Sequence, residues 1–377
     1  MPGETDRRFL TQSKASHRRR MRWASLAAVA ALGLTGITAV PAFAASYSIT
    51  DLGSLGYPTT FPAAINESGE VTGTSYLAEE VPITCTDRRE KNCKTHPERA
   101  FLYSAGKMTA LATGGGLTPV EGAAISASGE VAGTATSSHG DEAFVEQGGT
   151  LTGLGALVSG GSSSADAIND SGAVAGSSSV AEGGEHAFLY SAGKMTDLGL
   201  IPGSGGSYTD ATAINNSNQV VGSGDNAASD ERAWLYSNGK MTDLGTLGGP
   251  NAAANAINNN GEIVGSSQTA KDSEHPFLYK GGKMIDLGAF NLESVADAIN
   301  NSGVIVGQTY ELEKSGNAVF RAFIYSGGHF QDLNNLIPAG SGFVLTGAVA
   351  INNAGQILVE AESTSSGQTH ALVLNPN

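Results

Sequence analysis

The sequence predicts an all-β protein, a seven-bladed β-propeller of four-stranded blades. One phrase occurs seven times, most often at intervals close to 43 residues, and each complete copy contains four short apolar stretches separated by Gly-containing turns. The final copy lacks its fourth strand, and a matching strand stands near the start of the chain. A period of this length with four strands per repeat is typical of a propeller blade. We therefore expect a closed ring, with an open β-solenoid or another blade count as the alternative.

The first strand of each repeat, strand a, ends in Ala-Ile-Asn followed by a tight turn. The seven copies place their Asn, or Ser in the second copy, at Asn66, Ser126, Asn169, Asn215, Asn258, Asn300 and Asn352. Asn at the start of a tight turn usually bonds to its own backbone, and the Gly that follows accepts a positive φ without steric cost. We interpret these residues as turn formers. The alternative is a ring of amides that binds a ligand or metal along the channel.

Three further strands complete each repeat. Strand b is of the Val-Val-Gly-Ser type, as in residues 262–267, and strand c is Ala-Phe-Leu-Tyr. A Ser-x-Gly-Lys turn leads to strand d, Met-Thr-Asp-Leu-Gly. The clearest c–d copies are residues 187–199 and 233–245, and weaker ones begin at Ala100, Ala143, Pro276, Ala322 and Ala371.

The two ends of the chain supply one blade between them. The last copy has strands at residues 349–361 and 370–374 but no strand d, whereas Tyr47-Ser48-Ile49-Thr50-Asp51-Leu52-Gly53 resembles one. We predict that this N-terminal strand completes the seventh blade. Ring closure would remove the exposed sheet edges that invite aggregation.

The first 44 residues have the features of a signal peptide. An Arg-rich segment precedes an apolar run from Trp23 to about Val40, and Ala42-Phe43-Ala44 fits a signal peptidase site. We expect cleavage near Ala44, a secreted or periplasmic protein, and one propeller domain at residues 45–377 without a membrane span.

The charge of this domain excludes some partners. Residues 45–377 contain 14 Lys and Arg against 34 Asp and Glu, a net charge of −20. Such a surface repels nucleic acid and anionic membranes. We expect a monomer that binds neither nucleic acid nor a cofactor.

The first blade carries an insertion at residues 76–98 with both cysteines of the chain. Cys85 and Cys93 would form a local disulfide in an oxidising compartment, although two free thiols are the alternative. His96 alone adds too few ligands for a metal site, so we expect no metal. A candidate binding loop lies between the cysteines, at Asp87, Arg88, Arg89 and Lys91.

The repeats resemble the HAF repeat of bacterial extracellular proteins. The resemblance is carried by His186-Ala187-Phe188, His275-Pro276-Phe277 and His370-Ala371-Leu372, together with the Ala-Ile-Asn and Asp-Leu-Gly phrases, and it covers nearly all of residues 47–375. It implies export and a repeat fold, and it supplies no catalytic residues.

A cation and an acid recur in each c–d hairpin. The register of the hairpin pairs Phe188 with Asp197, so that His186 lies diagonal to Asp197 on one sheet face. The predicted structural pairs are His186 with Asp197, Arg232 with Asp243, His275 with Asp286, Arg321 with Asp332, and His370 with Asp51. The first copy has Arg99 but Ala110, and the second has Glu142 and Gly153. The alternative is a ring of cations that holds an anionic ligand.

Loop lengths favour a binding function over catalysis. The a–b and c–d turns are short in every copy, and all length variation falls in the b–c and d–a connections, which lie on the opposite face. Insertions confined to one face usually mark a binding face. We therefore expect a secreted, non-enzymatic binding module for an extracellular glycan, peptide or envelope protein.

Two alternatives stay open. One is a lyase or hydrolase acting on an extracellular polysaccharide, and the other is a structural component of the cell envelope or matrix. No nucleophile motif stands out. The acidic candidates near the axis do not pair obviously with a base, and these are Glu67, Glu121, Asp166, Asp210 and Asp297.

Overall fold

The computed structural model describes residues 46–82, 93–291, 293–312 and 318–377. The chain divides into two units, Met1–Ala44 and Ala45–Asn377, and the second is described here. The signal peptide, Cys85 and the candidate loop residues Asp87, Arg88, Arg89 and Lys91 lie outside the described residues, so these predictions stay predictions. Among the described residues, no helix is both long enough and apolar enough to cross a membrane.

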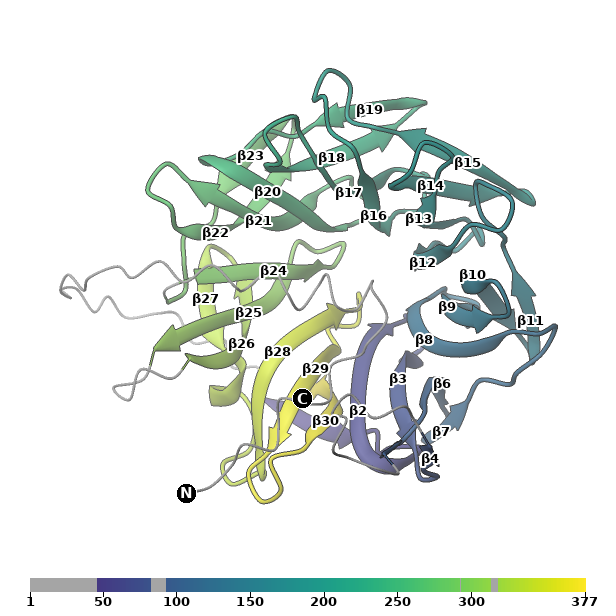
Figure 1. Ribbon diagram of the computed structural model, residues 1–377. Coiled ribbons are helices and arrows are strands. Elements are labelled where there is room, and N and C mark those ends of the chain that lie inside the picture. Colours follow the sequence, from purple (N-terminus) through teal and green to yellow (C-terminus); the bar gives the residue numbers. More distant parts are fainter. Residues whose placement is uncertain (1–45, 83–92, 292, 313–317) are drawn as a thin grey trace. The chain divides into compact units, whose positions relative to one another are not determined.

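The second unit is a seven-bladed β-propeller in which each blade is a four-stranded antiparallel sheet (Figure 1). This confirms the predicted fold class. Blade 1 consists of β2 (Gly56–Ile65), β3 (Val71–Leu77), β6 (Glu98–Ser104) and β7 (Lys107–Ala110). Blade 2 consists of β8 (Thr118–Ile125), β9 (Val131–Ser137), β10 (Gly140–Gln147) and β11 (Thr150–Gly153). Blade 3 consists of β12 (Ser163–Ile168), β13 (Val174–Ser179), β14 (Glu185–Ser191) and β15 (Lys194–Gly199).

The next three blades follow the same plan of strands a to d. Blade 4 consists of β16 (Thr209–Ile214), β17 (Val220–Asp225), β18 (Glu231–Ser237) and β19 (Lys240–Asp243). Blade 5 consists of β20 (Gly248–Ile257), β21 (Ile263–Thr269), β22 (Glu274–Lys280) and β23 (Lys283–Asp286). Blade 6 consists of β24 (Glu293–Ile299), β25 (Ile305–Leu312), β26 (Ala318–Ser326) and β27 (His329–Asp332).

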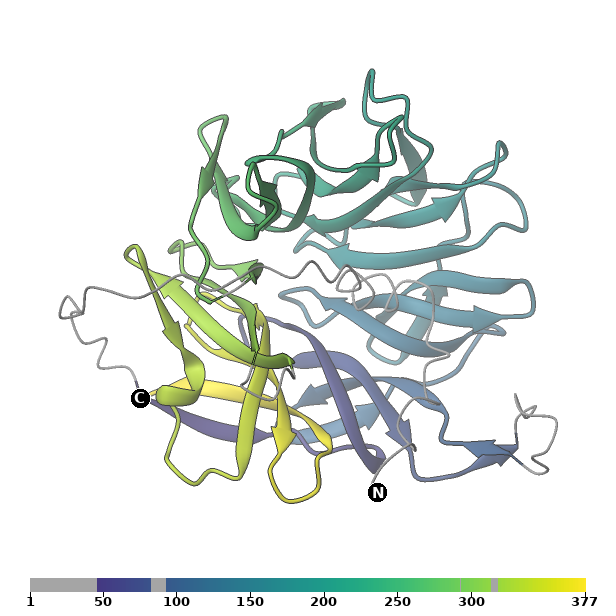
Figure 2. The ribbon, with the colours of Figure 1, turned by 60° about the vertical axis from the view of Figure 1, so that its left-hand side comes forward.

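Blade 7 joins the two ends of the described chain, as predicted. It consists of β28 (Phe343–Ile351), β29 (Ile357–Ser363), β30 (Thr369–Pro376) and β1 (Tyr47–Asp51). Ile49 pairs with Leu374, and Thr50 pairs with Val373. Figures 1 and 2 show the purple β1 beside the yellow β30. The ring is therefore closed by main-chain hydrogen bonds between strands more than 300 residues apart.

The hydrophobic core is divided among the interfaces between blades. Seven separate clusters of buried residues occur, one for each pair of neighbouring blades, including the pair formed by blades 7 and 1. Six blades have a fully buried aromatic residue on strand c, namely Phe101, Phe144, Phe188, Trp234, Phe277 and Phe323. All of them except Phe323 belong to these clusters. Each sheet buries both faces against its neighbours, which explains why the strands consist almost entirely of apolar or small residues.

A β-bulge lies in strand a of every blade, two residues before the Ile of Ala-Ile-Asn. In blade 5 the register shifts between Ala254 and Ala256. Strand b has Gly265 opposite this point, and a Cβ there would overlap the carbonyl oxygen of Ala253. The same overlap with strand a would arise in blades 1, 2, 3, 4 and 6, at Gly73, Gly133, Gly176, Gly222 and Gly307. The Gly of the Val-Val-Gly-Ser phrase is therefore required by the close approach of two backbones.

The longest connections lie at the end of each blade opposite to the a–b and c–d turns. We call the end with the a–b and c–d turns the turn face and the other end the loop face. On the loop face, β4 (Val81–Pro82) pairs with β5 (Lys94–Thr95) inside the insertion of blade 1. One 3-10 helix, η1 (Leu333–Asn335), lies in the described connection between blades 6 and 7.

Candidate functional site

The Asn residues of the turn face form the turns that the sequence predicts. Asn258 Oδ1 accepts hydrogen bonds from the backbone N–H groups of Asn260 and Glu262, both at 3.0 Å. The remaining Asn copies also accept from the N–H four residues ahead, and all of them are nearly fully buried. The carbonyl half of each amide therefore closes its own turn.

The side-chain NH₂ group of each Asn donates a hydrogen bond to a main-chain carbonyl of the next blade, a contact that the sequence does not predict. Asn258 Nδ2 donates to the carbonyl of Asn300 at 3.0 Å. Equivalent bonds of 3.0–3.3 Å run from Asn66 to Ser126, Asn169 to Asn215, Asn215 to Asn258, Asn300 to Asn352, and Asn352 to Asn66. We call this set the Asn ring. It is interrupted only between blades 2 and 3, where Ser126 replaces Asn.

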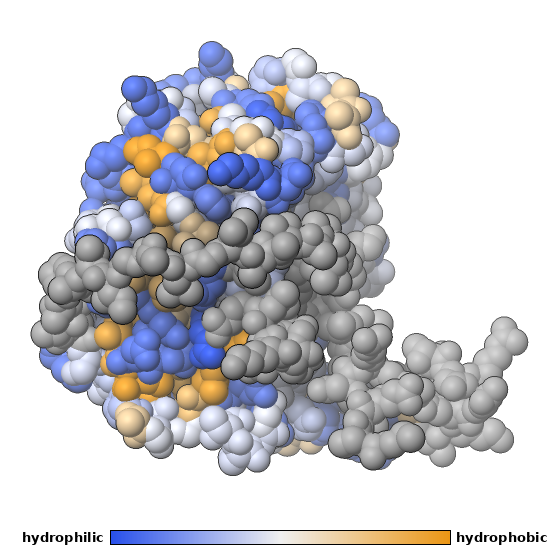
Figure 3. Space-filling view, turned by 90° about the vertical axis from the view of Figure 1, so that its left-hand side faces the viewer, coloured by the Kyte–Doolittle hydropathy of each residue, from blue (hydrophilic) through white to orange (hydrophobic). Residues whose placement is uncertain are grey.

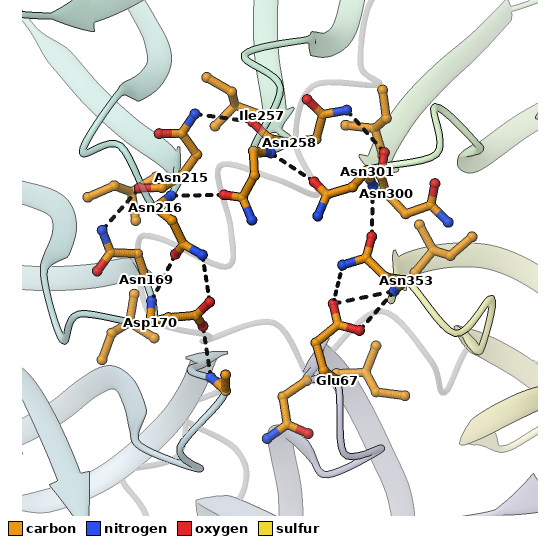
Figure 4. A pocket seen from close by; sticks show the side chains of 18 of the residues that line it. Glu67, Asn169, Asp170, Asn215, Asn216, Ile257, Asn258, Asn300, Asn301 and Asn353 are labelled. Carbon is orange, nitrogen blue, oxygen red and sulfur yellow. Dashed lines mark hydrogen bonds between the residues drawn. The ribbon is translucent and has the colours of Figure 1, made fainter.

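A second ring involves the residue after each Asn. Its side chain accepts a hydrogen bond from the main-chain N–H at the same position of the preceding blade (Figure 4). The bonds run from Ala127 to Asp170, Asp170 to Asn216, Asn216 to Asn259, Asn259 to Asn301, Asn301 to Asn353, and Asn353 to Glu67. Ala127 has no acceptor to offer blade 1. The Asn ring has no bond between blades 2 and 3, and the second ring has none between blades 1 and 2. Every pair of neighbouring blades is therefore joined by at least one of these bonds.

The two rings surround a polar pocket of about 250 Å³ at the channel mouth, and seven Ile residues also line it. Its two carboxylates are both engaged by protein groups. Glu67 accepts from the backbone N–H of Asn353, and Asp170 accepts from Asn216 Nδ2 at 2.6 Å. This arrangement joins blades, and it leaves neither carboxylate beside a general base.

The other acidic candidates also have protein partners. Ser223 Oγ donates to Asp210 at 3.0 Å, and Ser164 Oγ lies 3.5 Å from Asp166. Glu121 and Asp297 each take part in an interaction of their own. Among the described residues, no group of three or more His, Cys, Asp and Glu side chains is arranged to hold a metal ion.

A carboxylate on the turn face reinforces the Asn ring in blade 5. Glu262 accepts from Asn258 Nδ2 at 2.7 Å and from Lys280 Nζ at 2.6 Å. The hydrogen bond from Lys280 is the main reason that the pKa of Glu262 is lowered, and the bond from Asn258 adds to it. All four hydrogen-bonding positions of the Asn258 amide are therefore occupied.

The cation and acid of the c–d hairpins lie together in four blades. Arg232 contacts Asp243 through Nε and Nη2, both at 3.1 Å. Nδ1 of the His residues lies 2.8–3.0 Å from the carboxylate in the pairs His186–Asp197, His275–Asp286 and His370–Asp51. The acid also accepts from the N–H of the Gly two residues later, as in Gly245 to Asp243 at 2.8 Å. Each carboxylate is thus bound by a side chain and by the main chain.

Three blades depart from this pattern. In blade 6, Asp332 accepts from the N–H of Asn334 at 2.8 Å, and its predicted pairing with Arg321 stays a prediction. In blade 2, Glu142 on strand c accepts from the N–H of Gly155 at 3.1 Å. In blade 1, Ala110 stands where other blades have Asp. Arg99 Nη1 is buried and has no hydrogen-bond partner among the described residues, whereas Nη1 of Arg232 in blade 4 donates to the carbonyl of Pro250.

The loop face of blade 1 carries a cluster of aromatic rings. Tyr57 stacks on His96 with ring centroids 4.0 Å apart, and His96 Nδ1 lies 2.9 Å from the carbonyl of Leu77. Beside this stack, Lys94 bonds to Glu80 at 2.9 Å. That hydrogen bond lowers the pKa of Glu80. The described parts of the insertion are therefore ordered by ring stacking and by one ion pair.

A pair of aromatic rings, Tyr310 and Phe320, lies on the loop face of blade 6, with ring centroids 6.3 Å apart. Burial, and then the charge of Glu293 with its hydrogen bond, raise the pKa of Tyr310 to about 12. The phenol therefore stays protonated near neutral pH and acts as a hydrogen-bond donor, not as a base. Phe320, across the hairpin from Tyr310, is 37% exposed. The side of the ring shown in Figure 3 mixes hydrophobic and hydrophilic residues.

The geometry defines the class of the protein, a seven-bladed β-propeller whose blades are joined around the channel mouth by amide hydrogen bonds. It is similar to oligogalacturonate lyase from Vibrio parahaemolyticus, with 7% identity, a TM-score of 0.57, and coverage of 88% of this chain and 97% of the lyase. It is also similar to the β-propeller domain of the Trilobed protease from Pyrococcus furiosus, with 9% identity, a TM-score of 0.49 and coverage of 89% and 94%.

A further similar structure is TolB from Acinetobacter baumannii, with 12% identity and a TM-score of 0.42. The match covers 74% of this chain and spans only 60% of that protein. No family model and no curated protein sequence matches the chain. At 7% identity, the similarity to the lyase shows the fold alone.

Proposed function

We propose that the protein is a secreted, non-enzymatic binding module of the HAF-repeat type, and that it uses the loop face. The observation that carries this proposal is the contrast between the two faces. The turn face repeats one set of hydrogen bonds around the channel, whereas the loop face bears the insertions and the exposed aromatic residue Phe320. A rigid scaffold that presents variable loops is the usual design of a binding surface.

An enzymatic function has less support from the side chains. Catalysis by acid and base requires two groups that converge on one reacting atom. The carboxylates at the channel mouth instead accept from main-chain and Asn donors, and Tyr310 holds its proton. These contacts favour stabilising roles for the carboxylates. The proposed partner is therefore a glycan, a peptide or another envelope protein that is bound without being converted.

The proposal is tested by a glycan array and a pull-down of secreted proteins with the purified protein. Phe320→Ser and deletion of residues 84–94 each alter the loop face. Ile285→Ser is the matched control, because Ile285 is 45% exposed but lies on the outer strand β23, next to the c–d turn. We expect the loop-face variants to lose at least tenfold in affinity while the control binds normally. Equal binding by all variants, or turnover of any glycan, would contradict the proposal.

A further inference from the structure

The hairpins of this propeller contain a recurrent receptor for a carboxylate. In blade 4, the carboxylate of Asp243 receives two hydrogen bonds from Arg232 and one from the N–H of Gly245. Blades 3, 5 and 7 use His in place of Arg with the same acid position. A guanidinium that binds two oxygens of one carboxylate is a strong and specific arrangement.

Blade 1 has the cation of this receptor without the carboxylate. The backbone register is the same in both blades, because Phe101 pairs with Ala110 as Trp234 pairs with Asp243. Ala110 has no carboxylate to offer, and Arg99 Nη1 is buried without a hydrogen-bond partner among the described residues. Leaving a buried charged donor unpaired is unfavourable, so a carboxylate that reaches Arg99 would gain binding energy.

Arg99 as a whole is half-buried, and the chain beside it is open to solvent. Ala110 is partly exposed, and every residue from 112 to 116 is exposed. The N–H of Ala112 corresponds in sequence to the N–H of Gly245, which binds the acid in blade 4. The beginning of strand c and the end of strand d both lie on the loop face, so the position belongs to the surface proposed above for binding.

We infer that Arg99, with the main chain at Ala112, forms a subsite for the carboxylate group of a ligand, which takes the place of the Asp that blade 1 lacks. The inference rests on the proposed function, because it assigns one ligand chemistry to the loop face. A uronic acid and the C-terminus of a peptide share this chemistry.

The test uses sodium acetate as the probe and the side-chain Nε–H resonance of Arg99 in the ¹⁵N-labelled protein as the readout. We expect a saturable shift with a Kd on the order of 10 mM, as suits one charge-assisted contact, and no shift with acetamide. Ala110→Asp should abolish the shift and raise the melting temperature, because it restores the internal pair. Asp243→Ala should create a second acetate site, seen at Arg232.

The outcomes separate the subsite from the wider function. No saturable shift at Arg99, or unchanged acetate binding by Ala110→Asp, would overturn the inference. Acetate binding at Arg99 together with a negative glycan array and pull-down would support the subsite and contradict the binding-module proposal. Glucuronate against glucose, and a short peptide with a free against an amidated C-terminus, then distinguish the two sources of the carboxylate.

Discussion

The buried Asn residues contribute more than turn formation. An Asn side chain offers one acceptor oxygen and two N–H donors, and Asn258 uses all of them within its own turn and toward blade 6. A fully satisfied buried amide fixes its surroundings, whereas a partly satisfied one destabilises them. The Asn ring therefore determines how closely adjacent blades approach at the turn face.

Replacing Asn258 with Ala should lower the free energy of unfolding by about 3 kcal/mol, because it leaves two N–H groups and one carbonyl without their partner. Urea denaturation followed by circular dichroism measures the loss. Asn259→Ala is the control, since Asn259 accepts only from the exposed N–H of Asn216, and should lose less than about 1 kcal/mol. Equal losses of unfolding free energy in the two variants would show that the buried Asn ring stabilises the fold no more than the exposed second ring does.

At the residue scale, the sequence predicts the turn role of Asn but not the link between blades. The acceptor of each amide lies 42 to 60 residues ahead within the chain, or at Asn66 in the case of Asn352, and only packing brings it near. One signal was present. The doubled Asn at 215–216, 258–259, 300–301 and 352–353 is more than a turn requires. The absence of an acidic partner for Arg99 on strand d was predictable from the sequence, because Ala110 stands at the Asp position.

The bulge of strand a and the Gly of strand b act as one unit in each blade. A bulge increases local twist and bends the strand, and the Gly permits the approach of the partner backbone. Blade 7 has Val359 at the Gly position, and its β28 carries a second irregularity between Leu345 and Gly347. Strand a also has a second irregularity in blades 1, 2 and 5, whose strand b keeps the Gly, so the irregularity in blade 7 does not follow from Val359.

Gly265→Ala should destabilise blade 5 by about 2 kcal/mol or more, because its Cβ would overlap main chain that cannot move without disturbing the ladder. Thermal unfolding of the purified variant measures this. Gly114→Ala is the matched control, since a Cβ at Gly114 meets no atom within 4 Å, and its melting temperature should stay close to that of the parent. A Gly265→Ala protein as stable as the control would contradict the close-approach argument.

Elements were predicted better where the pattern is local. The pairing of Phe188 with Asp197 follows from the two-residue turn, and the structure has this register. The bulges were not predicted, because an extra residue in one strand is visible only once its partner is known. The contact of Glu142 with the N–H of Gly155 was likewise not predicted, because the second copy has neither the cation nor the Asp of the pattern.

The whole ring follows from counting strands, and its closure by β1 was predictable because the last copy is one strand short. Closure buries Leu52 with Val71, Phe101 and Val373 between blades 7 and 1. A sheet edge left open at this point would expose both main-chain groups and apolar side chains. The identity of a ligand was not predictable, because it depends on loops that do not repeat.

Deletion of residues 46–53 should therefore open the ring and give a species that associates or unfolds. Size-exclusion chromatography and thermal unfolding provide the measurements. Adding a synthetic peptide of residues 46–53 should restore part of the lost stability, since β1 contributes as a separate strand. A deleted protein with the elution volume and melting temperature of the parent would show that blade 7 does not need its fourth strand.

The interruptions of the two hydrogen-bond rings both adjoin blade 2. Five interfaces carry a bond from each ring, whereas blade 2 has a single such bond to blade 1 and a single one to blade 3. Local opening should cost least where fewest contacts must break. Amide protons of β8 and β9 should then exchange with deuterium sooner than those of β20 and β21. Local unfolding of this propeller would thus be concentrated in blade 2 instead of being spread evenly around the ring.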